Sequence, residues 1–350
     1  MHRPVLSRWF FAAFPLVLTC LLLPSATLGQ PRPDSPDTAG DAARTLQALT
    51  NANAAVVGVR VVAADGARSI DTLGRRREGS GVVIDQDGLI LTIGYLVTDA
   101  DQIAVRTQDN KVWPARVVAY DSATGFGLVR TVLPITVAPA TLGSTRDSKP
   151  GDALLVSIGA AGGDVAMTRL VSKRSFSGYW EYFIEGALFT TPPVANHSGA
   201  PLFNQKGELV GIGSLFTLET MGRETRVPGN MFVPIDLLRP ILDEMLRTGT
   251  TRQSRRPWLG LSSSEQAGRV QIVQINKDSP AQAAGLQPGD VVLAVDDAKV
   301  ATLEAFYKKL WEHADPTDSI KLTVLQGADL KTITLKAVDR STLMRKPDGV

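Results

Sequence analysis

The sequence has little cysteine, few aromatic residues and no excess of charge of either sign. Only one of the 350 residues is a cysteine, and 6% are aromatic. That cysteine, Cys20, lies in a segment that we expect to be removed, so the mature chain would hold neither a thiol nor a disulfide. Its stability must then come from hydrophobic cores, which a chain of this length can build.

The first 29 residues have the layout of a secretory signal peptide. Arg3 and Arg8 form a positively charged start, an apolar run extends from Phe10 to Leu23, and small residues lead to a cleavage site expected after Gly29. The alternative is a retained membrane anchor, although the run is shorter than the roughly 20 residues of a spanning helix. The sequence therefore predicts an exported protein, periplasmic or otherwise extracytoplasmic. It would have no membrane span after signal removal and would be membrane-anchored if the signal stayed.

Charge gives a further exclusion. The chain has 37 Lys and Arg against 35 Asp and Glu, and both basic residues of the signal segment would be lost on cleavage. A net charge of about zero argues against nucleic acid as the main partner.

The rest of the chain is predicted to be mainly β. Its 31 glycines and 21 prolines favour turns and short strands, and apolar runs at 112–119, 153–158 and 209–216 are typical of barrels or sandwiches. A short helix is expected over 42–55, and another from Ile235, ending near Gly249. The expected division is signal peptide 1–29, leader and short helix 30–50, first domain 51–247, linker 248–256, second domain 257–340 and tail 341–350.

The linker is polar and basic. It contains Arg252, Arg255 and Arg256, which we interpret as a solvated connection, with an anion site as the alternative.

The last hundred residues resemble a bacterial PDZ domain. Strands are expected at 270–275, 291–295, 319–325 and 331–335, with helices at 279–284 and 303–311. The stretch from Ser279 to Leu293, which reads SPAQAAGLQPGDVVL, closely resembles the central motif of these domains, and Trp258–Leu261 stands where they place their carboxylate-binding loop. The resemblance covers residues 256 to 340 and implies a small β-barrel with two helices.

A PDZ domain implies a peptide ligand. A glycine in the loop lets the backbone approach closely, so that the amides of Leu259, Gly260 and Leu261 can converge on a terminal carboxylate. The peptide adds as an extra strand, and an apolar pocket, for which Leu303 and Phe306 are candidates, takes its last side chain. The expected partners are C-terminal or extended peptide segments of proteins. The alternative is a groove that is empty or occupied by the chain itself.

Residues 78 to 247 resemble the trypsin-like domain of the HtrA serine proteases, which implies a double six-stranded β-barrel. The hairpin at 79–92 matches the stretch before the catalytic histidine, whose position holds Tyr95. In the stretch 121–128 the position of the triad aspartate holds Gly125. In Asn196–Leu202, which reads NHSGAPL, the nucleophile position keeps Ser198.

The lone serine predicts a loss of proteolysis. A serine hydroxyl is activated by a base that a third group orients, and a tyrosine with a pKa of about 10 is protonated at neutral pH. His197 is the direct sequence neighbour of Ser198 and is not expected to serve as the base, because adjacent side chains in an extended turn diverge. The oxyanion hole would be formed by the amides of Ser198 and Asn196, and asparagine tolerates the left-handed backbone that this turn needs.

We therefore expect a pseudoprotease: an HtrA-like scaffold, chaperone-like or regulatory protein that captures peptides, without a metal or another cofactor. It could form a homo-oligomer or a mixed assembly with an active relative. The alternatives are a serine endopeptidase with a non-standard site around Ser198, and a passive module without a ligand.

Overall fold

The computed structural model describes residues 38–159, 164–222 and 224–343. The predicted signal peptide, residues 30–37 of the leader and residues 344–350 of the tail lie outside these residues. Within them, no helix combines the length and apolar character needed to cross a membrane.

The first half of the chain forms a closed six-stranded barrel, in the order β1-β2-β3-β6-β5-β4. Its strands are β1 Val56–Ala63, β2 Arg76–Val83, β3 Leu89–Ile93, β4 Ala100–Arg106, β5 Val112–Tyr120 and β6 Phe126–Thr131. Helix α1, Thr38–Ala54, precedes the barrel and confirms the predicted N-terminal helix, while the short helices α2, Ile70–Leu73, and α3, Gly94–Val97, lie in its loops.

A second closed barrel follows, in the order β10-β11-β12-β9-β8-β7. Its strands are β7 Ala153–Ser157, β8 Val165–Gly178, β9 Tyr182–Thr191, β10 Pro201–Phe203, β11 Leu209–Thr217 and β12 Gly229–Pro234. Most of the buried side chains of both barrels belong to one hydrophobic cluster, so the barrels pack into a single body. The double six-stranded barrel predicted from the sequence is confirmed.

The C-terminal helix of this body is shorter than predicted. A 3-10 turn, η1 Ile235–Leu237, is followed by α4, Leu242–Thr248. The helix ends at Gly249, which has the left-handed φ of 75° expected of a terminating glycine.

The linker is not solvated throughout, contrary to the prediction. It contains the 3-10 turn η2, Arg252–Ser254, and the side chains of Thr251 and Ser254 are buried. Both donate hydrogen bonds to the buried carboxylate of Asp121 in the first barrel. The polar sequence of the linker predicts exposure, but Thr251 and Ser254 instead satisfy the hydrogen-bonding needs of a buried carboxylate. These bonds fix the start of the C-terminal unit.

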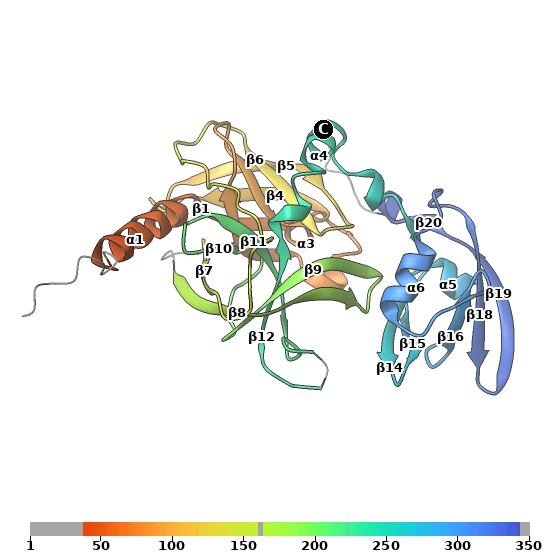
Figure 1. Ribbon diagram of the computed structural model, residues 1–350. Coiled ribbons are helices and arrows are strands. Elements are labelled where there is room, and N and C mark those ends of the chain that lie inside the picture. Colours follow the sequence, from red (N-terminus) through yellow and green to blue (C-terminus); the bar gives the residue numbers. More distant parts are fainter. Residues whose placement is uncertain (1–37, 160–163, 223, 344–350) are drawn as a thin grey trace, which may run out of the picture.

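The C-terminal unit has its own core and lies at the opposite end of the molecule from α1 (Figure 1). Its main sheet has the order β14-β15-β16-β18-β19, with β17 paired to β16, and is open rather than the small barrel expected. The strands are β14 Leu261–Gln266, β15 Arg269–Ile275, β16 Val291–Val295, β17 Ala298–Lys299, β18 Ser319–Gln326 and β19 Asp329–Lys336. A separate pair joins β13 Pro257–Trp258 to β20 Val338–Asp339, and the helices are α5 Pro280–Ala283, α6 Leu303–Leu310 and the 3-10 turn η3 Arg340–Leu343.

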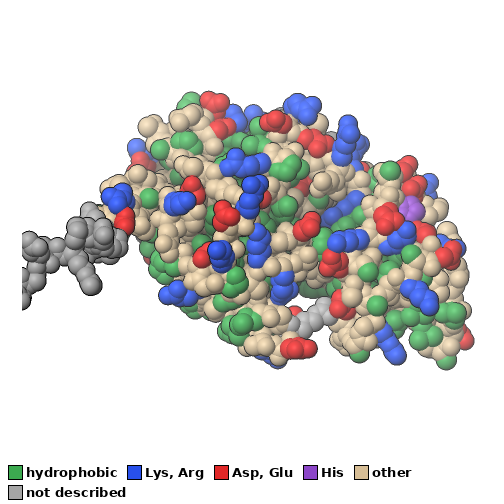
Figure 2. All heavy atoms as spheres, viewed as in Figure 1, with side chains coloured by type: hydrophobic (Ala, Val, Ile, Leu, Met, Phe, Trp, Pro, Cys, Tyr) green, Lys and Arg blue, Asp and Glu red, His purple; other side chains and the backbone are tan. Residues whose placement is uncertain are grey.

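Both predicted helices of this unit are confirmed. Ser279 caps α5 by accepting the amide proton of Gln282, and Thr302 caps α6 by accepting that of Ala305. Basic and acidic side chains are intermingled on the face that Figure 2 shows, in keeping with the balanced charge of the sequence.

Candidate functional site

Ser198 and Tyr95 meet between the two barrels. The hydroxyl oxygen of Tyr95, in α3, lies 2.7 Å from Ser198 Oγ and 2.8 Å from the main-chain oxygen of Ser214. A phenol carries one proton and a carbonyl oxygen can only accept, so Tyr95 donates to Ser214 and the Ser198 hydroxyl donates to Tyr95. The proton of Ser198 is therefore directed at a phenol oxygen.

This phenol is a poor base. Burial raises the pKa of Tyr95 to about 12, although the hydrogen bond with Ser198 acts in the opposite direction. A general base works best with a pKa near the operating pH. At neutral pH Tyr95 is a neutral phenol, and it cannot take the serine proton as an imidazole would.

The turn that carries Tyr95 is anchored by Arg77 of β2. This arginine is only 5% exposed. Its guanidinium donates to the carbonyl oxygens of Tyr95, at 2.9 Å, and Thr98, at 2.7 Å, and to the hydroxyl of Ser69, at 2.7 Å. The main chain at the tyrosine and at the end of α3 is thereby held against the first barrel.

Gly125 leaves no space for a carboxylate. Its φ is 82°, and a Cβ atom added to it would lie 2.7 Å from the hydroxyl of Tyr182. That hydroxyl is held in place, because it donates to the carbonyl of Thr124 at 2.7 Å. The volume beside α3 that an aspartate would need is occupied by a tyrosine from β9.

The turn around Ser198 is well ordered by its neighbours. Asn196 has a φ of 55° and Gly199 a φ of 70°, the left-handed conformation that these two residue types tolerate best. Ser80 donates its amide proton to the Ser198 carbonyl at 2.9 Å, and a Cβ atom on Gly199 would lie 2.2 Å from the Ser80 carbonyl. Close packing against β2 thus sets the shape of this turn.

His197 is engaged elsewhere. Its Nδ1 lies 3.2 Å from the carbonyl oxygen of Val194, and burial lowers its pKa. The hydroxyl of Ser198 has Tyr95 as its partner instead.

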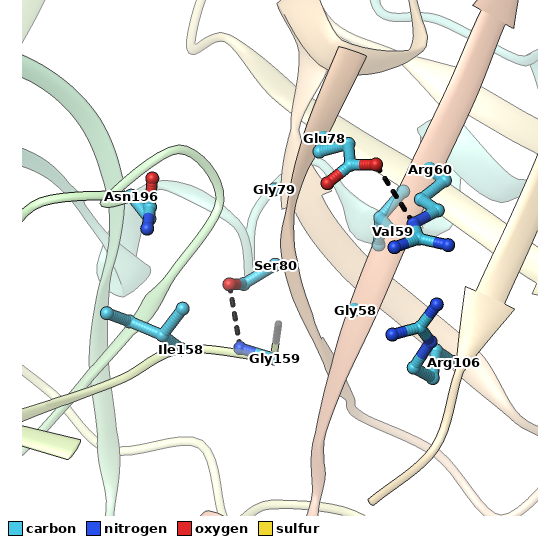
Figure 3. A pocket seen from close by; sticks show the side chains of 10 residues that line it. All are labelled: Gly58, Val59, Arg60, Glu78, Gly79, Ser80, Arg106, Ile158, Gly159 and Asn196. Carbon is cyan, nitrogen blue, oxygen red and sulfur yellow. Dashed lines mark hydrogen bonds and ion pairs between the residues drawn. The ribbon is translucent and has the colours of Figure 1, made fainter. Parts of the chain in front are cut away.

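A pocket of about 110 Å³ opens beside Asn196, between the β1–β2 edge and the second barrel (Figure 3). Ser80 accepts the amide proton of Gly159 across it at 2.9 Å. The guanidinium groups of Arg60 and Arg106 lie along the same side, and Arg60 pairs with Glu78 at 3.0 Å. The pocket could accept a short polar segment that passes the serine turn.

The predicted carboxylate-binding loop holds a carboxylate of the chain itself. The amide of Leu259 lies 3.1 and 3.3 Å from the two carboxylate oxygens of Glu181, and the amide of Leu261 donates to the same group at 3.3 Å. Between them, Gly260 has a φ of 80°, and a Cβ atom there would lie 2.3 Å from Ser279 Cβ. Only a glycine fits this turn without displacing α5.

Glu181 belongs to the β8–β9 turn, Gly178–Glu181, whose main chain contacts β14 and α6, while the ring of Trp180 packs against the core of the double barrel. Ser263 of β14 donates its amide proton to the Tyr179 carbonyl at 2.8 Å. Tyr307 of α6 donates its hydroxyl to the Gly178 carbonyl at 2.7 Å and accepts the amide proton of Glu181 at 3.2 Å.

The two pocket candidates on α6 are core residues. Leu303 and Phe306 are 3% and 0% exposed, and they share a cluster with Leu259 and Leu261. Phe183, which follows the turn, packs against this cluster and lies under Lys308, whose Nζ is 5.1 Å from the ring centroid.

Burial dominates the electrostatics of Glu181. The residue is 3% exposed, and burial raises its pKa to about 7. Arg340, the amides of Leu261 and Leu259, and Arg256 act in the opposite direction. Arg256 itself stacks over the Trp311 ring, with its Cζ 3.4 Å from the centroid. No sequence motif singled out Glu181; only its aromatic neighbours were unusual in a turn.

Family models match both parts of the chain. A trypsin-like peptidase domain matches residues 79–212, and a PDZ domain matches residues 257–337. The double barrel and the C-terminal unit are thus a trypsin-like domain and a PDZ domain, as the sequence resemblance implied.

Serine endoproteases of similar sequence agree with the two domain matches. A probable periplasmic serine endoprotease DegP-like from Halomonas elongata is 30% identical over 284 residues, which are 76% of this chain and 57% of the relative. The serine endoprotease DegS from Haemophilus influenzae is 28% identical over 71% of this chain and 73% of its own length. The chain therefore spans little more than half the length of the DegP-like relatives.

Solved structures share the fold. The HtrA-type protease AlgW with a decapeptide aligns with a TM-score of 0.54 at 22% identity, over 87% of this chain and 99% of its own. The serine endoprotease from Yersinia pestis aligns with a TM-score of 0.53 at 21% identity, over 84% of this chain and 97% of its own.

Proposed function

Since the chain is a homologue of the HtrA-type serine proteases, with a trypsin-like peptidase domain followed by a PDZ domain, we propose that it is a pseudoprotease. In this proposal it binds protein C-termini through the PDZ domain and does not hydrolyse them. The barrels act as a scaffold that presents the PDZ domain.

The observation that carries the proposal is the hydrogen-bond chain from Ser198 through Tyr95 to Ser214. In the family resemblance Tyr95 stands at the histidine position and Gly125 at the aspartate position. A neutral phenol replaces the base, and the hydroxyl of Tyr182 replaces the group that would orient a base. Loss of a triad member leaves only about 10³–10⁴-fold acceleration over water in a well-studied serine protease.

The binding part of the proposal rests on the geometry of the PDZ loop. The amides of Leu259 and Leu261 already hold a carboxylate, which is the group that a protein C-terminus would present. The site of action proposed is the periplasm or another extracytoplasmic space, as the names of the DegP-like relatives and the predicted signal peptide suggest. Self-assembly or mixed assembly with an active relative would bring the bound termini together.

Labelling with a serine-reactive fluorophosphonate, combined with cleavage of unfolded casein, tests the catalytic part. We expect the mature protein to show no more labelling and no more cleavage than its Ser198→Ala variant. An active HtrA protease in parallel supplies the positive control.

Labelling at Ser198 that disappears in Ser198→Ala, together with casein cleavage, would establish the alternative, a serine endopeptidase with a non-standard site. The ordered turn at Asn196 and Gly199 is the feature that favours this alternative, because the backbone amides beside Ser198 remain.

A further inference from the structure

The PDZ groove already contains a ligand, which is the chain itself. Three features of a bound C-terminal peptide are reproduced by the turn Gly178–Glu181, which connects two strands of the second barrel: a carboxylate on the loop amides, a main-chain hydrogen bond to β14, and polar contacts with α6.

The carboxylate comes from a side chain. A terminal peptide ends at its carboxylate, whereas an internal segment must continue, so it can fill the same place only by turning away. Glu181 does this with a left-handed φ of 57°, which sends the backbone into β9 while its side chain reaches the amides of Leu259 and Leu261. A non-glycine residue in this conformation is uncommon.

The main chain of the turn adds to the sheet edge. The amide of Ser263 donates to the carbonyl of Tyr179, as it would to a peptide added as a strand beside β14. On the other side of the groove, the hydroxyl of Tyr307 bridges the carbonyl of Gly178 and the amide of Glu181. The polar backbone groups of the turn thus find partners on both walls.

We propose that the Gly178–Glu181 turn is a displaceable internal ligand of the PDZ domain, in which Glu181 stands in for a C-terminal carboxylate, so that an external C-terminus binds only by displacing it. This rests on the proposed function in one respect, the identity of the external ligand. The turn and the PDZ domain then form a clasp, which also fixes the PDZ domain against the second barrel.

The clasp defines the external ligand that should compete best. A peptide with the sequence SFSGYWA copies residues 175–180 and ends in alanine, so that its own terminal carboxylate replaces that of Glu181. Only a free carboxylate satisfies the loop amides, so the same peptide with an amidated C-terminus should compete poorly.

Two measurements on the mature protein test the clasp. The first is the fluorescence-polarisation affinity of fluorescein-labelled SFSGYWA. Relative to the wild type, we expect Glu181→Ala to bind about tenfold or more tightly, because a groove that is mostly closed weakens the apparent affinity by the fraction of molecules that are open. Glu185→Ala, which removes an exposed carboxylate from the same hairpin, should bind as the wild type does.

The second measurement needs no ligand. Hydrogen exchange, followed by mass spectrometry, reports on the amides of residues 258–264. We expect exchange in this segment to be at least tenfold faster in Glu181→Ala than in Glu185→Ala, with thermal unfolding showing that both proteins are folded.

The outcomes separate the clasp from the proposed function. Faster exchange without peptide binding by any variant supports the clasp and refutes peptide capture. Equal affinity and equal exchange in Glu181→Ala and wild type would overturn the clasp and leave peptide capture standing. Equal tight binding of the amidated peptide would also overturn it, since the carboxylate would then have no role.

Discussion

The cleft at Ser198 and the groove of the PDZ domain are both filled by side chains of the chain itself, but in chemically opposite ways. At the cleft, the neutral phenol of Tyr95 accepts a hydrogen bond from the Ser198 hydroxyl and, in the function that we propose, stands in place of the base. At the groove, a carboxylate receives the amide protons that a ligand would receive. In our proposal Tyr95 therefore replaces a part of the catalytic machinery, whereas Glu181 imitates a ligand.

The two occupants also differ in how firmly they are attached. Tyr95 lies on a turn whose main chain Arg77 anchors from within the first barrel. The Gly178–Glu181 turn is held by a few hydrogen bonds, each contributing about 1 kcal/mol net. A peptide of micromolar affinity, at about −8 kcal/mol, can compete with such a contact. The occupant of the cleft is thus part of the anchored fold of the first barrel. The occupant of the groove is in equilibrium with an open state that a peptide can bind.

The largest effect is expected from giving the cleft a base. Tyr95→His places an imidazole beside Ser198, and general base catalysis contributes about 10²–10⁴-fold when the base is well oriented. With no carboxylate at Gly125 to orient it, we expect labelling of Ser198 by fluorophosphonate to rise by only about 10–100-fold. Tyr95→Phe, which is matched in size and has no base, should stay at the wild-type level. Equal labelling of the two variants would show that something other than the base is missing.

The groove should respond to pH and the cleft should not. Burial raises the pKa of Glu181 to about 7, from the value of about 4.3 that an exposed glutamate has. The closed state thus binds a proton that the open state releases, so closure is favoured below about pH 5 and weakens as the pH rises through 7.

The affinity of the wild type for SFSGYWA should accordingly increase between pH 5.5 and 7.5, by at most about tenfold per pH unit. Arg256, Arg340 and Tyr307 also face Glu181, but none of them titrates in this range in the open state. In Glu181→Gln the affinity should be flat, and an equal slope in this variant would assign the pH dependence to another group.

Removing a hydroxyl at each site should separate binding from stability. Tyr307→Phe loses the bridge to Gly178 and Glu181, and we expect peptide affinity to rise about fivefold, which corresponds to roughly 1 kcal/mol of lost clasp. Tyr95→Phe leaves the Ser214 carbonyl without the phenol and should lower the free energy of unfolding by about 1–2 kcal/mol, with peptide affinity unchanged. Denaturant unfolding gives the free energy of unfolding of both variants, and fluorescence polarisation gives their peptide affinity. An effect of Tyr95→Phe on affinity would contradict the separation.

The smallest effect is expected at His313, on the PDZ domain. Hydrogen bonds that His313 donates to Asp296 and Asp318 raise its pKa, so its charged form stabilises the fold below pH 6.5, and this contribution is lost as the pH rises through the folded-state pKa. His313→Gln should cost about 0.5 kcal/mol at pH 6, as expected of a partly exposed ion pair, and nothing at pH 9. Peptide affinity should not change. A change would show that His313 influences the displacement of the Gly178–Glu181 turn from the groove.

Much of the fold could be predicted from the sequence, because the short apolar runs that form strands and the PDZ motif are both local signals. The hairpin at 79–92 and the short helix at 279–284 followed from such local signals. The open PDZ sheet and the buried polar linker did not, since sheet closure and the pairing of Thr251 and Ser254 with Asp121 depend on contacts between distant segments.

The cleft and the groove could likewise be predicted only in part. The positions of Tyr95 and Gly125 could be located within motifs, but the hydroxyl of Tyr182 that fills the space at Gly125 could not. Self-occupation of the groove was an open alternative, and nothing near Glu181 marked it as the occupant. Its role arises from a contact between residues 78 positions apart.

The most direct test of the account is fluorophosphonate labelling of Ser198 while the groove is saturated with SFSGYWA, read by intact mass spectrometry and repeated in Glu181→Ala. Because Tyr95 and the clasp are independent in this account, opening the groove leaves the phenol against the serine. Labelling should stay at the level of Ser198→Ala under every condition. Labelling that appears when the peptide is added, and that Ser198→Ala abolishes, would show that the protein is a protease controlled by its own clasp.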